Sequence, residues 1–264
     1  MLKIHDVHKT FNKGTINEKV ALNGLELELN QGDFVTVIGG NGAGKSTMLN
    51  MIAGVYPVDQ GNIVIDGVDV TGQPDFKRAA YLGRVFQDPM MGTAADMEIQ
   101  ENLAMAYRRG KKRGLRWGIT QKEKVVYKEK LKQFDLGLEN RMSTKVGLLS
   151  GGQRQAITLL MATLQQPKVL LLDEHTAALD PKTAATVLSL TEKIVQENNL
   201  TTVMVTHNMK DAIRYGNRLV MMHEGRIIYD VCGEEKKALH VSDLLKKFEE
   251  VSGEEFANDR MMLS

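Results

Sequence analysis

Short apolar runs separated by polar turns fill the first part of the chain. Residues 2–7 and 24–29 alternate or cluster apolar side chains as strands do, and the mostly polar stretch 12–18 between them predicts a turn or loop. Another short strand is expected at residues 62–66. Residues 34–38 form a continuous β-rich apolar run, which is typical of a buried parallel strand. The pattern therefore predicts an antiparallel layer beside a parallel core.

The middle of the chain has a different period. From about residue 90 to residue 166 the strand pattern disappears, and apolar residues recur at helical spacing. Three helices are expected there, at residues 98–109, 121–134 and 153–164. Because strand patterns resume afterwards, we interpret this region as a helical insert and not as a separate domain.

Strand-like segments lie on both sides of the insert. Residues 81–86 precede it, and the apolar run 168–173 after it predicts a buried parallel strand. A crossover helix is expected at residues 181–198, with Pro181 at a favourable first-turn position. The next strand, at residues 201–206, follows at the distance expected for a βαβ unit.

The last part of the chain predicts a hairpin and a helix. Residues 218–222 and 226–230 are two strand-like runs joined at Glu224 and Gly225. Residues 241–260 read as a charged amphipathic helix whose apolar residues should pack onto the domain.

Composition narrows the class of protein. The 264 residues carry 34 basic and 33 acidic side chains, so the net charge of +1 gives no pull toward nucleic acid. The single cysteine, Cys232, excludes an internal disulfide and fits a reducing compartment. No apolar run approaches the roughly 18 residues of a membrane span, and the start lacks a signal-peptide pattern. We expect a soluble, cytosolic protein whose membrane role, if any, comes through a partner.

A glycine-rich loop carries the strongest chemical signal. Residues 39–47 read G-G-N-G-A-G-K-S-T and satisfy G-x-x-x-x-G-K-[ST], between the predicted strand and a helix expected at residues 47–53 that Gly54 ends. Glycines let backbone N–H groups converge on an anion, and the helix dipole favours negative charge there. Lys45 would reach the β- and γ-phosphates of a nucleotide, and the Ser46 hydroxyl would ligate Mg²⁺.

Two carboxylates end the buried strand after the insert. Asp173 and Glu174 lie where ligands bind in open α/β sheets. Phosphoryl transfer needs one acidic group to hold Mg²⁺ and another to orient the attacking water, and these residues suit the two roles in that order. In isolation, the same pair would equally well start a solvated loop.

A second glycine turn opens the third helix of the insert. Residues 149–153 read L-S-G-G-Q, and by the same dipole reasoning they form a second anion site. Taken alone, the pattern would favour an ordinary serine N-cap.

These motifs together resemble the ATP-binding subunit of an ABC (ATP-binding cassette) transporter. Residues 149–153 match the signature sequence of that family, and residues 39–47 and 168–174 match its Walker A and Walker B motifs. Their order and spacing agree over about residues 2–230. The resemblance implies an α/β P-loop NTPase fold of ABC type, with a RecA-like parallel sheet core, an antiparallel β layer and a helical insert.

The resemblance also implies a domain organisation. Residues 1–264 would form one ABC ATPase domain. Its catalytic core with the β layer would comprise residues 1–89 and 167–240, its helical signature subdomain residues 90–166, and its C-terminal helix residues 241–264.

Roles for individual residues follow from the same resemblance. Phe11 lies where the family stacks an aromatic ring on adenine, although an ordinary strand aromatic is the alternative. Asp180 ends the stretch 177–180 that matches the D-loop at the dimer contact. His207 matches the switch histidine beside the γ-phosphate, although a lone histidine at a strand end is usually structural. The implied nucleotide-binding residues are Phe11, Gly39, Gly40, Asn41, Gly42, Ala43, Gly44, Lys45, Ser46, Thr47, Ser150, Gly151, Gly152, Gln153 and Asp180.

The implied catalytic residues are Glu174, His207, Lys45 and Gln87. The implied Mg²⁺ ligands are Ser46, Gln87 and Asp173, and Gln87 would also link the nucleotide to the helical insert.

The family's geometry implies partners as well. Two subunits would pack head to tail as an ATP-bound homodimer, each closing its serine-glycine turn over the ATP of the other, and hydrolysis at Glu174 would separate them. ATP and Mg²⁺ are the expected cofactors. Separate transmembrane permease subunits and an extracytoplasmic solute-binding protein are the expected partners, with no nucleic acid. The subunit would lie in the cytoplasm, held to the inner face of the membrane by the permease.

The direction of transport and the solute carry weaker signals. Residues 144–149 lack the acidic residue typical of the exporter loop, which favours import. The D-E-H-T-A-A-L-D run at 173–180 and the basic insert resemble a bacterial branch linked to uptake of amino acids or similar small solutes. The alternatives are a soluble ABC ATPase acting on ribosomes, DNA or protein assembly, and a metabolic P-loop kinase in which the signature would be coincidental.

Three features depart from the common family pattern. His175 stands where the family usually has proline, and it is either a branch substitution or a group that tunes Glu174. Leu160 stands where many relatives carry arginine. The basic run 108–117 is either a solvated loop or a contact with anionic headgroups or an acidic permease loop.

Overall fold

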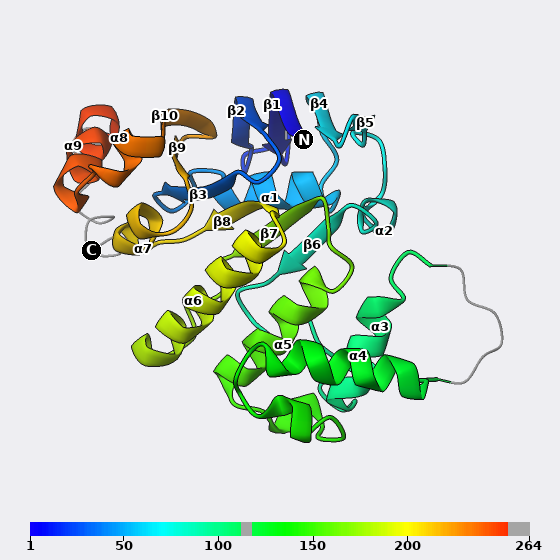
Figure 1. The fold of residues 1–264 in the computed structure, drawn as a ribbon. Helices are drawn as coiled ribbons and strands as arrows, with labels where there is room; N and C mark the ends of the chain where they lie inside the picture. The colour runs from blue at the N-terminus through cyan, green and yellow to red at the C-terminus, as the bar shows by residue number, and fades with distance from the viewer. Residues whose placement is uncertain (112–117, 253–264) are drawn as a thin grey trace.

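The computed structural model describes residues 1–111 and 118–252. Two β-sheets lie one above the other, and a group of helices extends away from the central sheet (Figure 1). This arrangement confirms the predicted α/β fold with a parallel core and an antiparallel layer.

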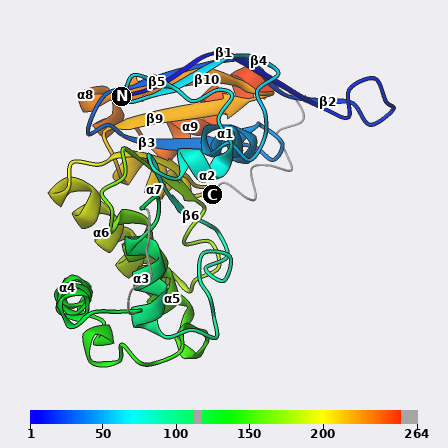
Figure 2. The same ribbon diagram turned by 90° about the vertical axis from the view of Figure 1, so that its right-hand side faces the viewer.

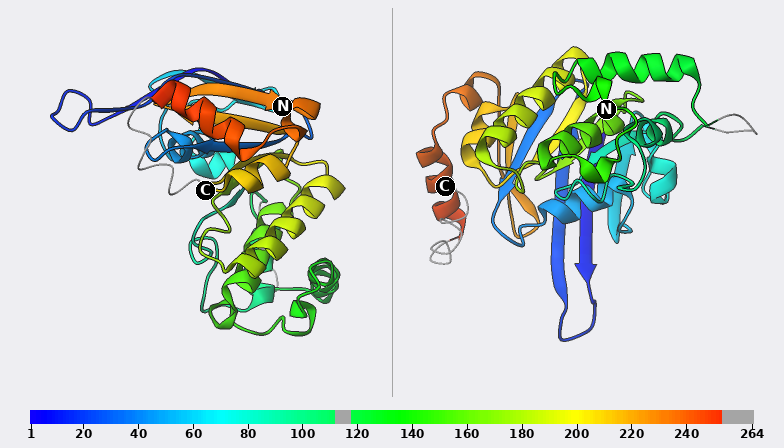
Figure 3. Two further views of the ribbon diagram at one scale, coloured as in Figure 1. Left: turned by 90° about the vertical axis from the view of Figure 1, so that its left-hand side faces the viewer. Right: turned by 90° about the horizontal axis from the view of Figure 1, so that it is seen from below.

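The antiparallel layer is a four-stranded sheet with the order β2-β1-β4-β5. Its strands are β1 (Leu2–Phe11), β2 (Lys19–Leu29), β4 (Gln60–Ile65) and β5 (Val68–Asp69). Along β1, Leu2 and Ile4 are buried while Lys3 and His5 are exposed, which is the alternation expected of a half-buried strand. β1 and β2 extend beyond the apolar runs that predicted them, since backbone pairing continues to Phe11 opposite Lys19. The resulting hairpin projects well beyond the rest of the molecule (Figures 2 and 3).

The central sheet has six strands in the order β10-β9-β3-β8-β7-β6. These are β3 (Phe34–Gly39), β6 (Leu82–Val85), β7 (Val169–Asp173), β8 (Thr201–Val205), β9 (Arg218–His223) and β10 (Arg226–Cys232). The parallel strands are β3, β6, β7, β8 and β9, and β10 runs antiparallel to β9 as the predicted hairpin. Every residue of β3 and β8 is buried, as the continuous apolar runs indicate.

Helices cover both faces of the central sheet. α1 (Lys45–Ala53) lies between the two sheets, where Met48 and Leu49 pack with Val35 and Leu171 of one face. The helices beyond the other face are α3 (Ile99–Tyr107), α4 (Gln121–Lys132), α5 (Gly151–Thr163) and α6 (Pro181–Glu197). One hydrophobic cluster joins these helices to Leu170 of β7, so the insert shares its core with the sheet.

The chain beyond β8 builds a third, smaller core. The helices of this part of the chain are α7 (Met209–Arg214), α8 (Gly233–Lys237) and α9 (Val241–Ser252), and α7 and α9 contribute residues to that core. Leu244 and Phe248 of α9 are buried in a cluster with Leu219 and Val231, which confirms the predicted packing of this helix. The remainder of the predicted helix, residues 253–260, lies outside the described residues.

Two kinds of prediction were wrong in detail. α1 and α5 each begin two residues earlier than predicted, because glycine and polar residues of the two turns already adopt helical geometry. The pattern also missed β5, α7, α8 and α2 (Asp75–Arg78), since elements this short do not complete two periods. Among the described residues, no helix combines the length and the apolar character needed to cross a bilayer.

Candidate functional site

The phosphate loop joins the end of β3 to the start of α1. Gly44 caps α1 with a φ of 100°, in the left-handed region that favours glycine. A Cβ at this position would lie 2.6 Å from the carbonyl oxygen of Ala21, so a larger residue requires the backbone to move. Gly54 ends α1 with a φ of 81°, which confirms the predicted helix stop.

Lys45 is buried within this loop. Its Nζ donates hydrogen bonds to the carbonyl oxygens of Gly39, at 2.6 Å, and Gly40, at 2.9 Å. The side chain thus ties the first turn of α1 to the end of β3 and sets the curvature of the loop between them.

A pocket of about 280 Å³ opens beside the loop. It is lined by residues of β1, β2, the phosphate loop and the ends of β7 and β8. These residues are Phe11, Lys19, Ala21, Asn41, Gly42, Ala43, Gly44, Lys45, Ser46, Thr47, Glu174 and His207. The structure therefore brings most of the predicted nucleotide-binding residues of the loop to one cavity with Phe11, Glu174 and His207.

Phe11 stands at one wall of this pocket. Its ring packs edge-on against Tyr56, with ring centroids 5.2 Å apart, and Lys9 Nζ lies 5.7 Å from the Phe11 centroid. Lys19, paired with Phe11 across the hairpin, lines the same pocket. The sequence did not identify Tyr56 or Lys19, because an aromatic after α1 and a lysine in a strand carry no motif.

Glu174 and His207 face the phosphate loop from the carboxyl ends of β7 and β8. Nε2 of His207 lies 2.6 Å from Oε1 of Glu174, and the Glu174 side chain is only 11 % exposed. Glu174 has a φ of 45°, a left-handed conformation that is uncommon for a residue with a side chain. Its N–H donates to the carbonyl oxygen of Val205 at 3.1 Å, which holds this conformation.

Asp173 is partly buried next to Glu174. Burial raises the pKa of Asp173, and Arg84 and Lys45 act in the opposite direction. Nη2 of Arg84, on the neighbouring strand β6, lies 3.5 Å from Oδ2 of Asp173. Sequence reasoning missed Arg84, because the two residues are far apart along the chain and meet only through sheet pairing.

The donor set here fits Mg²⁺. Hydroxyl and carboxylate oxygens, such as those of Ser46 and Asp173, are the ligands that this ion prefers. The described residues contain no cluster of three or more His, Cys, Asp or Glu that could hold a metal ion by themselves. Such a site suits an ion bound through one or two protein groups together with phosphate oxygens.

Nine predicted site residues are not among those that line this pocket. They are Gly39, Gly40, Gln87, Ser150, Gly151, Gly152, Gln153, Asp173 and Asp180. Gln87 follows β6 and is exposed. Ser150 caps α5 in a capping box with Gln153, each side chain accepting a 3.3 Å hydrogen bond from the other's backbone N–H.

The glycine turn at residues 149–153, here called the signature turn, is held against the start of α6. A Cβ at Gly152 would lie 2.2 Å from Cγ2 of Thr183, and one at Gly151 would lie 3.1 Å from a methyl group of Leu179. Asp180 caps α6 by accepting a hydrogen bond from the Thr183 N–H at 3.1 Å. Two helix N-termini are thus fixed side by side, with Ser150, Gly151 and Asp180 exposed.

His175 is turned away from the site. Its ring is 2 % exposed, and Nε2 lies 3.1 Å from Oγ1 of Thr191 on α6. Because the Thr191 hydroxyl donates to the carbonyl of Val187, Nε2 is the donor in its contact with Thr191. Burial lowers the pKa of His175 to about 4. This placement favours the structural interpretation of His175 over a group that tunes Glu174.

Two arginines of the basic run have structural contacts. Arg108 forms a 2.7 Å ion pair with Glu123, and Arg109, which is partly buried, donates to the carbonyl oxygen of Ala162 on α5 at 3.5 Å, whereas Lys111 is exposed. These two residues therefore do not belong to a solvated loop. Residues 112–117 of the run lie outside the described residues.

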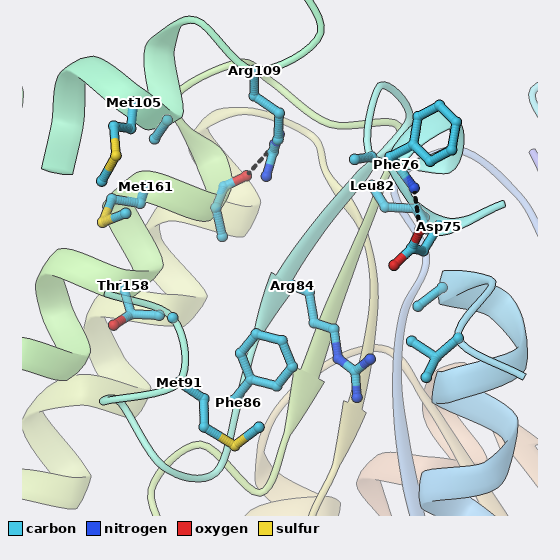
Figure 4. A pocket seen from close by; sticks show the side chains of 16 residues that line it. Asp75, Phe76, Leu82, Arg84, Phe86, Met91, Met105, Arg109, Thr158 and Met161 are labelled. Carbon is cyan, nitrogen blue, oxygen red and sulfur yellow. Dashed lines mark hydrogen bonds between the residues drawn. The ribbon is translucent and has the colours of Figure 1, made fainter. Parts of the chain in front are cut away.

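A groove of about 530 Å³ lies between β6 and helices α2, α3 and α5 (Figure 4). Much of its apolar lining comes from Phe76, Phe86, Met91, Met105 and Met161. Phe76 and Met91 are each 71 % exposed, which is unusual for such large apolar side chains. Arg84 and Arg109 also line this groove.

Residues 22–177 match the family model described as ABC transporter, over more than half of the chain. The chain belongs to the ABC transporter ATP-binding family. A tyrosine transport ATP-binding protein of Clostridioides difficile is 44 % identical over 249 residues, which covers 94 % of this chain and 99 % of that protein. The thiamine import ATP-binding protein ThiQ of Shigella flexneri is 34 % identical, over 80 % of this chain and 86 % of ThiQ.

A solved structure agrees with the fold of this ABC cassette. It is the dimeric post-hydrolysis state of the ATP-binding cassette MJ0796 bound to ADP and Pi, with a TM-score of 0.74 and 29 % identity over 88 % of this chain and 98 % of that one. The chain is therefore an ATPase of the ABC family, which rules out the predicted alternative of a metabolic P-loop kinase.

Proposed function

We propose that this ABC ATPase energises solute transport through a separate permease, and that the Glu174–His207 pair facing the phosphate loop performs the hydrolysis. A carboxylate at this position accepts the proton of a water attacking the γ-phosphate. His207, 2.6 Å from Oε1, orients that carboxylate. This pair, enclosed in one pocket with the loop, is the observation that carries the proposal.

Binding of the triphosphate is assigned to the loop and its lysine. The convergent backbone of residues 41–47 and the dipole of α1 favour an anion, and Lys45 supplies the positive charge. Phe11 stacks on the adenine. Ser46, Asp173 and Gln87 hold Mg²⁺, which neutralises charge on the phosphates when bound.

The signature turn acts on a second subunit in this proposal. Ser150 and Gly151 are exposed at the N-terminus of α5, and they do not line the pocket of their own chain. Head-to-tail pairing would place Ser150, Gly151, Gly152 and Gln153 over the nucleotide of the partner. Asp180, fixed next to them, would lie at the same contact. ATP would then drive closure through contacts made only in the dimer.

A mixing experiment tests this arrangement. Lys45→Ala disables the phosphate loop, and Ser150→Asp impairs the signature turn, so each variant alone should hydrolyse ATP at least about tenfold more slowly than the wild type. In a mixture, heterodimers contain one intact composite site if the turn works in trans. We therefore expect partial recovery of phosphate release on mixing. Mixtures as inactive as the separate variants would contradict the head-to-tail site.

The groove between β6 and the helices is the surface proposed for the permease. Its exposed Phe76 and Met91 are suited to an apolar helix face, and Phe86, which also lines it, directly precedes Gln87 in the chain. The identity of 44 % with a tyrosine transport protein over nearly the full length supports import of an amino acid. An extracytoplasmic solute-binding protein completes the proposed system, and the subunit itself lies in the cytoplasm on the inner membrane face.

Co-purification from detergent-solubilised membranes tests the permease assignment. We expect the wild type to retain a polytopic membrane protein, and Phe76→Ser with Met91→Ser to lose it while basal ATP hydrolysis stays within about twofold, since neither side chain lines the phosphate pocket. The control pair Val125→Ser and Val126→Ser, exposed on α4, should retain the permease. Recovery of ribosomes or nucleic acid in its place would support the alternative of a soluble non-transport ATPase.

A further inference from the structure

Arg84 lies between the two sites that the proposed function assigns to the metal and to the permease. It is on β6, directly beside β7, and its side chain is only 15 % exposed. One side of the residue lines the groove between β6 and helices α2, α3 and α5, where Figure 4 shows it next to Phe86. On the other side, Nη2 lies 3.5 Å from Oδ2 of Asp173.

The guanidinium group has few other partners. Its central carbon lies 4.6 Å from the centroid of the Phe86 ring, a cation–π contact. Its Nε is buried and has no hydrogen-bond partner among residues 1–111 and 118–252. In that same part of the chain, Asp173 is the one carboxylate paired with Arg84. Burying a guanidinium, which has five donors, while one of them lacks a partner costs free energy. We therefore expect its positive charge to serve a purpose at this position.

Asp173 needs a positive neighbour when it binds no metal. It is a partly buried carboxylate beside a second carboxylate, Glu174, and both features disfavour its charge. Lys45 is the other cation acting on it, but its Nζ is already hydrogen-bonded to two loop carbonyls. Arg84 forms the ion pair with Asp173 that the structure shows, at 3.5 Å.

We propose that Arg84 is a positioning residue for the metal site: it holds Asp173 while the metal is absent and releases Oδ2 when the metal binds. This inference rests on the proposed role of Asp173 as a metal ligand. Two cations compete for one carboxylate, so the arginine weakens metal binding and keeps the carboxylate in place between cycles. Because Arg84 also lines the groove, binding of the metal and occupancy of the groove act on a single side chain.

Metal affinity, measured without turnover, tests the proposal. Mn²⁺ binding would be titrated by electron paramagnetic resonance with saturating ATP, in a Glu174→Gln background that blocks hydrolysis. Arg84→Met should lower the dissociation constant for Mn²⁺ by about threefold to tenfold, because the competing charge is gone. ATP affinity in EDTA should change by less than about twofold, since Arg84 does not line the phosphate pocket. Arg109→Met, which removes another groove arginine away from Asp173, should change neither value.

The variant Asp173→Asn distinguishes failure of the metal assignment from failure of the role proposed for Arg84. If it leaves Mn²⁺ binding unchanged, the metal assignment in the proposed function is wrong and the role of Arg84 falls with it. If it weakens Mn²⁺ binding while Arg84→Met leaves it unchanged or weaker, only the role of Arg84 is overturned. Should Arg84→Met not fold, Arg84→Gln takes its place with the same expectation.

Chemical labelling gives a second readout on the unmodified arginine. Phenylglyoxal modification of Arg84, followed by mass spectrometry in the Glu174→Gln protein, should increase when Mn²⁺ is added to the ATP-bound form. Arg109 is the internal reference for any general opening of the groove. An equal increase at both arginines, or none at Arg84, would contradict release from Asp173.

Discussion

Helices α1 and α5 both begin at a glycine-rich turn, but the two turns are embedded differently. The turn before α1 closes around its own Lys45 and opens into a pocket that four other segments help to line. The turn before α5 is satisfied by a local capping box, and its first residues, Ser150 and Gly151, are exposed. The two share the dipole of a helix N-terminus and differ in what surrounds it.

This difference indicates how each turn can act. A turn enclosed by other segments of its own chain can bind a ligand within one subunit. A turn that is rigid but exposed offers its N–H groups to something outside the chain. Close packing of Gly152 against Thr183 fixes that exposed turn without covering it. The following predictions disturb the two turns separately.

The largest effect is expected at the enclosed turn. Glu174→Gln removes the carboxylate that accepts the proton, so phosphate release should fall by at least about a hundredfold. The same variant should accumulate as a dimer with MgATP, measured by light scattering. Glu224→Gln is the matched control, because Glu224 also has a positive φ, of 44°, but lies in the turn between β9 and β10. Wild-type turnover by Glu174→Gln would exclude this residue as the base.

A smaller but still large effect is expected at the exposed turn. Ser150→Asp keeps an N-cap of equal quality and, in the proposed head-to-tail dimer, would place a carboxylate against the partner's phosphate. ATP hydrolysis should fall by about tenfold or more, while the melting temperature stays nearly constant. Thr120→Asp makes the same change in the capping box of α4 and should leave hydrolysis unchanged. An equal loss in both variants would show that helix capping, and not the exposed turn, was disturbed.

Phe11→Ala should affect nucleotide affinity more than turnover. Loss of the stacking ring should weaken ATP binding by about fivefold to tenfold, measured by calorimetry, while Phe11→Tyr should bind normally. Tyr56→Ala, which removes the edge-on support of that ring, should have a weaker effect. If Phe11→Ala bound ATP with unchanged affinity, Phe11 would be an ordinary strand aromatic and not a stacking residue.

The smallest effect concerns stability at low pH. His175 is neutral in the fold, with a pKa of about 4, and protonates near pH 6.5 when unfolded. The contribution of the neutral, buried His175 ring to the free energy of unfolding is therefore complete above pH 6.5 and is lost as the pH falls toward 4. Within that window, the unfolding free energy of the wild type should fall faster than that of His175→Gln, by up to about 1.4 kcal/mol per pH unit.

Urea unfolding at several pH values measures this slope. The pH–rate profile of ATP hydrolysis should be the same in His175→Gln and the wild type, because the ring contacts α6. A shifted profile would restore the interpretation in which His175 tunes Glu174.

Much of the fold was predictable from local pattern. Apolar runs such as residues 34–38 and 168–173 identified the buried strands, because a strand covered on both faces must be apolar throughout. The helical period of the insert was equally clear. Strand order was not predictable, since β6 lies at the sheet edge beside β7 although the whole insert separates them in sequence.

The site was predictable where its residues belong to contiguous motifs. Lys45, Asp173 and Glu174 were predicted from motifs within their own segments, and the family resemblance added Phe11 and His207. Arg84 was not predictable, because nothing in residues 82–86 indicates that a carboxylate of another strand is its partner. Lys19 and Tyr56 were missed for the same reason. Contacts of this kind exist only after the sheet has formed.

The backbone of Glu174 has a consequence for protein engineering. A left-handed residue with a side chain stores roughly 1 kcal/mol or more of conformational strain, which glycine would relieve. Methods that raise thermostability by placing glycine at such torsions would select this position early. Under the role proposed for Glu174, they would yield a more stable cassette that cannot hydrolyse ATP, because the strained residue is the one that carries the proposed base.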